Sequence, residues 1–316
     1  MSNVQAIMVS DLHLQPRAPV ARSEERCWLE AMRRPLREIE RLAEDHDAPV
    51  VYAGDVFDRW NAPAETINFA IKNLPAGFAI PGQHDLPNHN YHDIQRSAYW
   101  TLVEAGVLQT LTPGRPTRLS EHPGSRVLAY GWPWGFDVVP PCPPGHPGER
   151  YNPDPDMIHL AVIHAFAYTR GTGYVGADKD AHLSGWAGRL NGYTAAVFGD
   201  NHQGFQARAG GCNVVNNGGM MRRNINEAER KPGCSLLWDD GKISLYWFDT
   251  SADRLVQRTG NEVQAEAVFN TAEFMEDLRV IGGGDGLDFE DALTRWMDGK
   301  QTTKAVRDLV WRAVSD

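Results

Sequence analysis

The sequence lacks the cysteine pattern of a zinc ribbon or of a disulfide-stabilised domain. It contains four cysteines, and no two of them form a C-x-x-C pair. Zinc ribbons need paired cysteines at that spacing, and small disulfide-rich domains carry many more cysteines for their length. The cysteines therefore indicate neither class, and they favour a reducing, cytoplasmic location as the expected one.

Positive charge and long apolar runs are also scarce. The 31 basic side chains are outnumbered by 41 acidic ones, which gives a formal net charge of -10. A broad basic surface for nucleic acid is therefore not expected, although bound cations or a partner subunit would offset local acidity. No apolar stretch approaches the roughly 18 residues of a membrane helix, and the start MSNVQAIMVS lacks the pattern of a signal peptide. We expect no membrane association.

The length and the distribution of apolar residues favour one large domain followed by a small one. The chain has 316 residues, of which 42% are hydrophobic, so it can bury a sizeable core. After Asp249 the spacing of apolar residues becomes helical, with three glycines at 282–284 between two of the segments. We expect a catalytic domain over residues 1–249 and a small helical C-terminal region over residues 250–316.

Short apolar runs recur along the larger part, and their lengths favour buried strands. A helical pattern lies between the first two runs, over Cys27–Ala43, where Pro35 is expected to kink or restart the helix. A hairpin is expected over residues 234–248. This alternation of strands and helices predicts an α/β architecture. The six expected strands are Val4–Val9, Pro49–Ala53, Gly77–Ile80, Arg126–Tyr130, Ile158–Ile163 and Thr194–Phe198.

Five of these runs lead directly into side chains that can bind metal ions. In α/β sheets such groups gather beyond the carboxyl ends of the strands, so the five sets are expected to converge. Carboxylate oxygens and imidazole nitrogens together suit Mn²⁺, Fe²⁺ or Zn²⁺. If the chain stays extended, residues two apart point the same way, so Asp11 and His13 can reach one ion, and Asp200 and His202 both face the metal site. The candidates are Asp11, His13, Asp55, Asp58, Gln83, His84, Asp85, His164, Asp200 and His202.

Each fragment has an ordinary explanation when it is taken alone. A single D-x-H is mostly chance, G-D is a common turn, and His164 in an apolar run would more often be a core histidine. His159 alternates with the apolar face of the same run and is expected to be exposed. The ordered occurrence of the whole set, each member after a strand, favours a site with two metal ions that Asp55 can bridge.

The ordered set resembles the calcineurin-like metallophosphoesterase superfamily, whose pattern runs D-x-H, G-D-x-x-D, G-N-H-D/E, a lone H and G-H-x-H. The resemblance covers roughly residues 5–248 and implies a four-layer α/β/β/α sandwich with two divalent ions. Mn²⁺ is the expected metal, with Mg²⁺, Fe²⁺ and Zn²⁺ as alternatives. One ion would be held by Asp11, His13, Asp55 and His202, and the other by Asp55, Gln83, His164 and Asp200.

The resemblance also assigns roles to three neighbours of the ligands and marks two departures. His84 would face the substrate and assist the leaving group, Asp85 would orient His84, and Asp58 would support the ligands without binding a metal. Gln83 stands where the family has Asn, and Asp200 stands where it has the first His of G-H-x-H. Both departures fall on the second ion, whose site becomes more anionic and favours Mn²⁺ or Mg²⁺.

Within the superfamily, the segments around Asp11, Asp55 and His84 look like those of DNA-repair nucleases, the SbcCD-type exonuclease subunit and its bacteriophage relatives. This likeness implies DNA as substrate, an SMC-like ATPase partner or a homodimer, and His89 and Arg222 as candidates for substrate contact. The acidic charge keeps a small-molecule or cyclic-nucleotide phosphodiesterase as the main alternative, and a non-catalytic scaffold is a third. A protein phosphatase is disfavoured because Trp60 replaces the glycine of its G-D-x-x-D-R-G.

Overall fold

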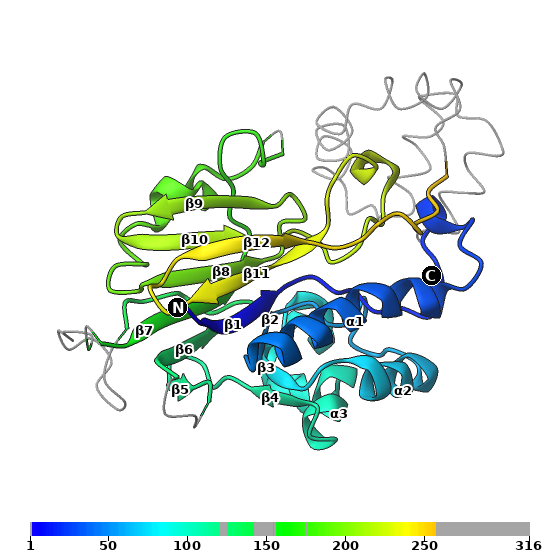
Figure 1. The fold of residues 1–316 in the computed structure, drawn as a ribbon, viewed down its shortest axis with the longest axis horizontal. Coiled ribbons are helices and arrows are strands. Elements are labelled where there is room, and N and C mark those ends of the chain that lie inside the picture. Colours follow the sequence, from blue (N-terminus) through cyan, green and yellow to red (C-terminus); the bar gives the residue numbers. More distant parts are fainter. Residues whose placement is uncertain (1, 121–124, 142–153, 155, 175, 257–316) are drawn as a thin grey trace, which may run out of the picture. The chain divides into compact units, whose positions relative to one another are not determined.

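The computed structural model describes residues 2–120, 125–141, 154, 156–174 and 176–256 (Figure 1). The helical segments that the sequence predicts between residues 257 and 316 lie outside these described residues. The boundary between a catalytic domain and a C-terminal region at residue 249 therefore stays a prediction.

The first sheet has six strands in the order β12-β11-β1-β2-β3-β4 (Figure 1). Its strands β1 to β4 run parallel to one another, whereas β11 is antiparallel to both β1 and β12. The last two strands are the hairpin that the sequence predicts. The bounds are β1 Val4–Val9, β2 Val50–Ala53, β3 Gly77–Ile80, β4 Leu108–Thr110, β11 Gly233–Trp238 and β12 Ile243–Trp247.

The second sheet also has six strands, in the order β5-β6-β7-β8-β10-β9. Its four central strands are parallel, and an antiparallel strand pairs with each edge of that group. The parallel centre means that β7 and β8 end side by side. The bounds are β5 Pro116–Arg118, β6 Val127–Trp132, β7 Ile158–His164, β8 Ala195–Gly199, β9 Phe205–Ala209 and β10 Cys212–Asn216.

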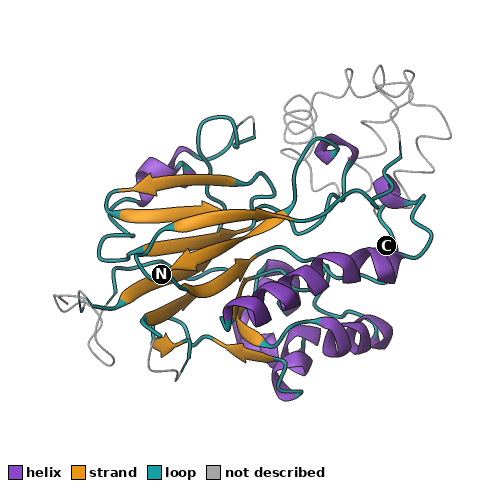
Figure 2. Ribbon diagram, viewed as in Figure 1, coloured by secondary structure: helices purple, strands orange, loops and turns teal. Residues whose placement is uncertain are grey.

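Three α-helices pack against the first sheet: α1 Trp28–His46, α2 Ala64–Asn73 and α3 Ala98–Glu104 (Figure 2). α1 continues through Pro35, so the expected restart there is wrong. Proline has no N–H group and so removes one hydrogen bond from the helix. The Pro35 ring is buried, and its packing offsets this loss. The 3₁₀ turns are η1 Val20–Arg22, η2 Gln83–Asp85, η3 Pro87–His89, η4 Tyr91–Arg96, η5 Lys179–Ala181, η6 Leu183–Trp186 and η7 Ile225–Glu227.

Apolar side chains form one core between the two sheets and a further core on the outer face of each. The core between the sheets includes Met8, Val51 and Val162. The outer face of the second sheet is covered by the segment that carries Trp186 and Leu190, which η6 opens and which has no long helix. The fold is therefore the predicted α/β sandwich, with its α-helical layer on one side and a thinner cover on the other.

The segment that covers the outer face of the second sheet also buries His159. His159 was expected to be exposed, but its relative exposure is 1%. Tyr193, from the covering segment, and Tyr130, from β6, lie on the same face, and the Tyr130 hydroxyl is 3.0 Å from His159 Nδ1. Alternation within β7 placed His159 on the outer face correctly, but that face is not open to solvent.

Candidate metal centre

The carboxyl ends of five parallel strands, from both sheets, meet at one edge of the sandwich. β1, β2 and β3 end before the loops that carry Asp11, Asp55 and Gln83, and β8 ends at Gly199 before Asp200. His164 is the last residue of β7. Because β1 to β3 are neighbours in one sheet and β7 and β8 in the other, the topology alone brings these loops together.

Several ligand candidates occupy the left-handed backbone region, which side chains other than glycine rarely adopt. The φ angles are 52° at Asp11, 46° at His13, 50° at Asp55 and 85° at Asp200. Each such residue costs about 1–3 kcal/mol, and residues held this way cluster at functional sites. The expected extended D-x-H is therefore wrong. The chain turns after β1 because the N–H groups of Asp11 and His13 donate to the carbonyl oxygens of Gly54 and Asp55.

Two imidazoles and two carboxylates form the first half of the centre. The Nε2 atoms of His13 and His202 are 3.0 Å apart. Asp55 Oδ2 lies 3.7 Å from His13 Nε2, and Asp11 Oδ1 lies 3.9 Å from His202 Nε2. These four residues are the set that the sequence analysis assigned to one ion.

The second half contains Asp55, Gln83, His164 and Asp200, the set assigned to the other ion. His164 Nε2 is 2.6 Å from Gln83 Oε1 and 3.5 Å from Asp55 Oδ2. Gln83 Nε2 donates to Asp200 Oδ1 at 2.6 Å. Asp200 is thereby linked to His164 through an amide, and its backbone N–H donates to Asp11 Oδ1 at 2.9 Å. The structure thus places all seven predicted ligands in one connected cluster.

Two glycines leave room for this cluster. A Cβ atom at Gly54 would collide with the His164 ring, and one at Gly82 would collide with the Asp55 carboxylate. Gly54 also has a φ of 92°, which favours glycine. These positions let the backbone of the β2 and β3 loops approach the ligand side chains closely.

The donor set fits two cations. Asp11 Oδ2 and Asp55 Oδ2 are buried and have no hydrogen-bond partner, although a buried carboxylate oxygen normally has one. His164 faces the Ala53 carbonyl oxygen with Nδ1 and the Gln83 and Asp55 oxygens with Nε2, so both ring nitrogens meet acceptors. Groups of His and Asp ligand atoms lie within 4.8 Å of one another on both sides of Asp55, so the chain can bind two metal ions.

The pKa values of the protein without metal are shifted by the charged groups that lie close together in the cluster. Burial by itself would lower the pKa of His164, but Asp55, Asp11 and Asp200 outweigh burial and raise the pKa to about 10. Burial raises the pKa of Asp200. A cation that takes the place of the His164 proton would satisfy the same oxygens.

His84 and Asp58 lie beside the first half. The His84 side chain is 43% exposed, its Nδ1 lies 2.7 Å from the Asp58 carbonyl oxygen, and its Nε2 lies 4.0 Å from Asp55 Oδ2. Asp58 Oδ1 is 3.5 Å from His13 Nδ1 and forms an ion pair with Arg223. Burial would raise the pKa of Asp58, but His13 and Arg223 outweigh burial and lower it. Asp58 thus contacts His13 through its carboxylate and His84 through its backbone carbonyl oxygen, and its role in supporting the ligands stays a prediction.

Asp85 has a different position from the one expected. Its carboxylate accepts the N–H groups of Gly82, Val56 and Phe57 at 2.9–3.1 Å. Burial and the nearby Asp55 raise the pKa of Asp85 to about 7. Asp85 therefore joins the β2 and β3 loops through their backbones and positions His84 only indirectly, since these carboxylate bonds go to backbone groups.

The two candidates for substrate contact differ in how their side chains are placed. His89 is exposed, with a φ of 56°. Arg222 donates to Asp253 and to the carbonyl oxygens of Ala228 and Thr250, so its guanidinium group is used in hydrogen bonds within the protein. The next residue, Arg223, is the one that reaches the site. The sequence offered no signal to choose between two adjacent arginines.

Asn201 is a structural residue of the site that the sequence analysis did not single out. It is 3% exposed, and its Nδ2 donates to the carbonyl oxygens of Ala167 and Thr172. It therefore ties the loop after His164 to the loop that carries Asp200 and His202. Its position between two ligand candidates was the available signal.

Comparison with known proteins assigns the family. The profile of the calcineurin-like phosphoesterases matches residues 6–204. No sequence of a characterised protein gave a significant match. Among the described residues, no helix is both long and apolar enough to cross a membrane.

Comparison with solved structures gives matches of low identity. A sulfate thiohydrolase, SoxB, from Thermus thermophilus is 12% identical with a TM-score of 0.43, covering 86% of this chain and 61% of its own. An archaeal phosphodiesterase is 10% identical with a TM-score of 0.38, covering 78% of this chain and 100% of its own. The calcineurin-like phosphoesterase YfkN from Bacillus subtilis is 13% identical with a TM-score of 0.42, covering 87% and 100%.

The family profile spans the five loops up to the last ligand candidate, His202, and the structure brings these loops to one edge with the donor atoms for two metal ions. The chain belongs to the calcineurin-like phosphoesterase family and is a metal-dependent phosphoesterase.

Proposed function

We propose that this phosphoesterase cleaves phosphodiester bonds in DNA, with Mn²⁺ as its metal. The observation that carries the proposal is an aromatic cluster on the loop after His164. The Phe166 ring contacts the tilted rings of Tyr174 and Tyr168, at centroid distances of 5.0 Å and 5.9 Å. Tyr174 is 65% exposed. Exposed aromatic rings beside a hydrolytic centre suit nucleobases, because each stacked base contributes about 1–3 kcal/mol.

The aromatic cluster is fixed relative to the centre. Asn201, which lies between Asp200 and His202, holds the loop through two hydrogen bonds, and one of these goes to Thr172, two residues before Tyr174. A base stacked on Tyr174 would therefore be held by the loop that is tied to the ligand residues. Rigid support of this kind positions a substrate for attack.

The chemistry would be shared between metal ions and three side chains. Two divalent ions held by the seven ligand candidates would clamp a phosphoryl group and lower the pKa of an attacking water. His84 donates through Nδ1 to the Asp58 carbonyl oxygen and places Nε2 4.0 Å from Asp55 Oδ2, on a side chain that is partly exposed. As the bond between phosphorus and the leaving oxygen breaks, protonated His84 gives its Nε2 proton to that oxygen. Asp58 and Arg223 hold the position of His84 and His13.

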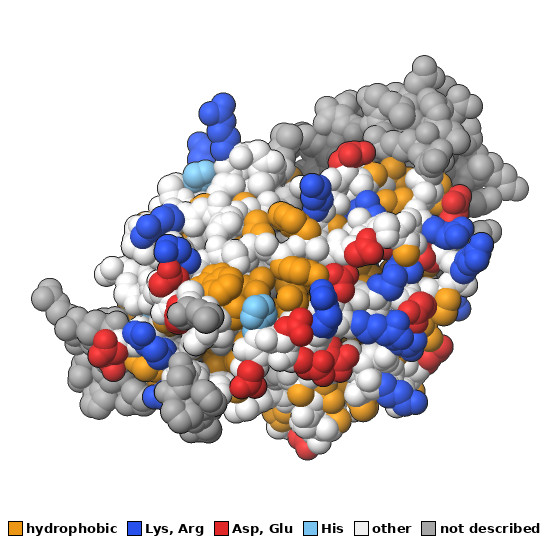
Figure 3. All heavy atoms as spheres, viewed as in Figure 1, with side chains coloured by type: hydrophobic (Ala, Val, Ile, Leu, Met, Phe, Trp, Pro, Cys, Tyr) orange, Lys and Arg blue, Asp and Glu red, His pale blue; other side chains and the backbone are white. Residues whose placement is uncertain are grey.

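A second candidate is hydrolysis of a small or cyclic nucleotide. The net charge of -10 favours it, because a long polyanion gains less from an acidic protein. On the face that Figure 3 shows, acidic and basic side chains are interleaved rather than gathered by sign. DNA binding would then depend on the centre and its margins, with an SMC-like ATPase partner or a second copy supplying further surface.

The test compares substrates on one protein preparation. Mn²⁺-loaded protein is assayed on linear duplex DNA, single-stranded DNA, a cyclic nucleotide, an aryl phosphodiester and an aryl phosphomonoester. We expect cleavage of DNA and of the aryl diester in preference to the monoester. Intact DNA together with cyclic-nucleotide hydrolysis would favour the second candidate.

Two variants exclude a contaminating nuclease. His84→Ala should lower the activity on every substrate by roughly 10²–10³, whereas His46→Ala changes an exposed histidine at the C-terminal end of α1 and should leave the activity unchanged. Equal activity in all three preparations would assign the cleavage to a contaminant.

A further inference from the structure

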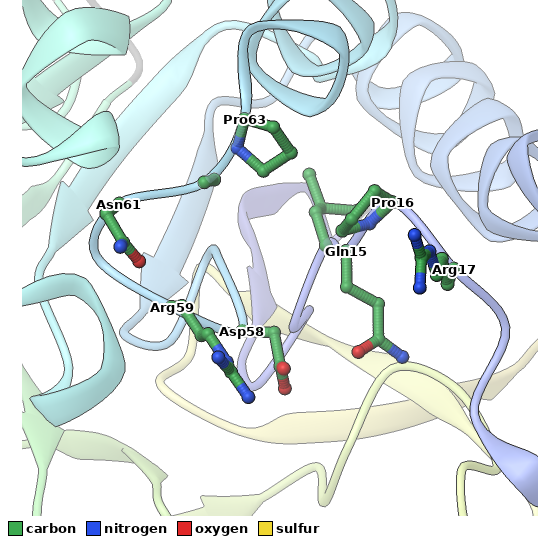
Figure 4. A pocket seen from close by; sticks show the side chains of 9 residues that line it. Gln15, Pro16, Arg17, Asp58, Arg59, Asn61 and Pro63 are labelled. Atoms are coloured by element: carbon green, nitrogen blue, oxygen red, sulfur yellow. The ribbon is translucent and has the colours of Figure 1, made fainter. Parts of the chain in front are cut away.

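A pocket of about 450 Å³ begins where the metal centre ends (Figure 4). Asp58 belongs to both, because it lines the pocket and also lies in the group formed with His13 and His84. The volume is within the range of roughly 300–1,000 Å³ that small ligand sites have. A substrate that occupies the centre can therefore extend into this pocket without leaving the surface.

The polar groups of this pocket are mostly hydrogen-bond donors. Arg17 and Arg59 line it and are exposed, and among the described residues neither side chain has an ion pair or a hydrogen bond. In Figure 4 they lie on either side of Gln15 and Asp58. The single acidic group that lines the pocket, Asp58, is already paired with Arg223. Within the described part of the chain, the pocket thus carries two guanidinium groups without a protein partner, although the chain is acidic overall.

Gln15 supplies a second, independent observation that points to a ligand. Its Nε2 is buried and has no partner, while its Oε1 accepts from Arg223 at 3.5 Å. A buried amide N–H without a partner is unfavourable unless a ligand or water accepts from it. The only side-chain acceptor of the pocket besides the amides is Asp58, which is used elsewhere. An anion is the ligand that suits two free guanidinium groups and such an N–H.

We propose that this pocket, lined by Gln15, Arg17, Asn61 and Arg59, binds the phosphate of the nucleotide next to the bond that is cleaved. The proposal rests on the proposed function, because it names a polynucleotide with at least two phosphates as the substrate class. Arginine forks bind phosphate oxygens in pairs, and the amides of Gln15 and Asn61 supply further N–H donors. A substrate with one phosphate leaves the pocket empty.

The first experiment measures binding without catalysis. Metal-free protein is titrated with a fluorescein-labelled oligothymidine, and anisotropy is followed in wild type and in the Arg17→Ala/Arg59→Ala variant. Loss of charge-assisted hydrogen bonds should weaken binding about tenfold or more. The dependence of log Kd on log salt should also flatten, by about 0.7 for each phosphate of the single strand that the variant leaves unneutralised.

The control removes the same charge at the opposite edge of the sandwich. Arg118 ends β5 and Arg208 lies on β9, and their strand partners Leu128 and Asn213 are at the amino ends of β6 and β10. Arg118→Ala/Arg208→Ala should bind the oligonucleotide as wild type does. Equally weakened oligonucleotide binding in both double variants would show a general effect of charge and would overturn the proposal that this pocket binds a phosphate.

The second experiment separates the pocket from the function of the centre. With Mn²⁺, kcat/KM is measured for a trinucleotide with two phosphates, a dinucleoside monophosphate with one, and an aryl phosphodiester. The Arg17→Ala/Arg59→Ala variant should have a lower kcat/KM for the trinucleotide only, because KM for this substrate rises. If wild type cleaves all three and the variant shows no such selectivity, the pocket proposal is wrong and the function stands. If wild type cleaves only the aryl diester, both proposals fall.

Discussion

The two halves of the metal centre differ in what holds their side chains. In the first half, His13 and Asp55 have supports outside the ligand set: Asp58 and Arg223 lie behind His13, and the N–H of His84 donates to Asp55 Oδ1. In the second half, His164 also has an outside partner, the Ala53 carbonyl oxygen, but the Gln83 and Asp200 side chains are held by other ligand candidates. Gln83 bridges His164 and Asp200, so both the oxygen and the nitrogen of its amide are used inside the set.

This difference in the supports of the side chains should make the two halves differ in their affinity for a metal ion. Supports behind a ligand keep its lone pairs free for a metal ion, whereas contacts between ligands must be broken or shared when an ion binds. The two departures from the family pattern, Gln83 and Asp200, both lie in the half that is internally bonded. We expect the first half to bind its ion more tightly than the second.

The largest effect on activity should come from the histidine that borders the first half. His84→Ala removes one group that acts on the leaving oxygen, which typically costs roughly 10²–10³ in kcat. Metal content should stay near that of wild type, because His84 is not among the seven ligand candidates. Steady-state rates on an aryl diester and elemental analysis of the same samples measure both. Activity within about threefold of wild type would contradict the role of His84.

A change confined to the second half comes next. Asp200→Ala removes one carboxylate and leaves Gln83 Nε2 without its acceptor. The weaker of two Mn²⁺ binding events should lose about tenfold or more in affinity, while the tighter event stays. Calorimetric titration of wild type and variant measures both events. Unchanged stoichiometry and affinity would show that Asp200 does not bind metal.

The smallest effects should come from the two adjacent arginines. Arg223→Ala removes the partner of Asp58 and should lower activity or first-ion affinity by about tenfold, as changes behind a ligand commonly do. Arg222→Ala is the matched control, because its contacts go to Asp253 and to backbone carbonyl groups. It should lower stability in urea and leave the metal affinity alone. The reverse order of effects on metal affinity would mean that the support for Asp58 has been misassigned.

Sequence patterns predicted the strands that end in the site better than those at the sheet margins. Val4–Val9 and Gly77–Ile80 were predicted with their observed bounds, because each is a short apolar run that ends at polar or turn-forming residues, Ser10-Asp11 and Pro81-Gly82. β4 and β5 have three residues each, too few for alternation to be recognised. β9 and β10 have five each, with mixed polarity that carries little periodic signal.

The identity of the ligand candidates was predictable, but their local geometry was not. The order of Asp11, Asp55 and His164 after strands placed them at one edge, which follows from topology alone. The left-handed backbone at Asp11 depends on its bond to Gly54, more than 40 residues away in the chain. The roles of Asp85 and Arg222 likewise depend on partners distant in sequence. Spacing along one segment cannot encode such contacts.

The most direct test of the central claim is anomalous diffraction from crystals of the protein grown with Mn²⁺. The account predicts two peaks on either side of the Asp55 carboxylate, one bound by Asp11, His13 and His202 and a weaker one bound by His164. Crystals of Asp55→Asn grown in the same way should show both peaks reduced. A wild-type map with no metal within coordination distance of Asp11, His13 and Asp55 would contradict the account.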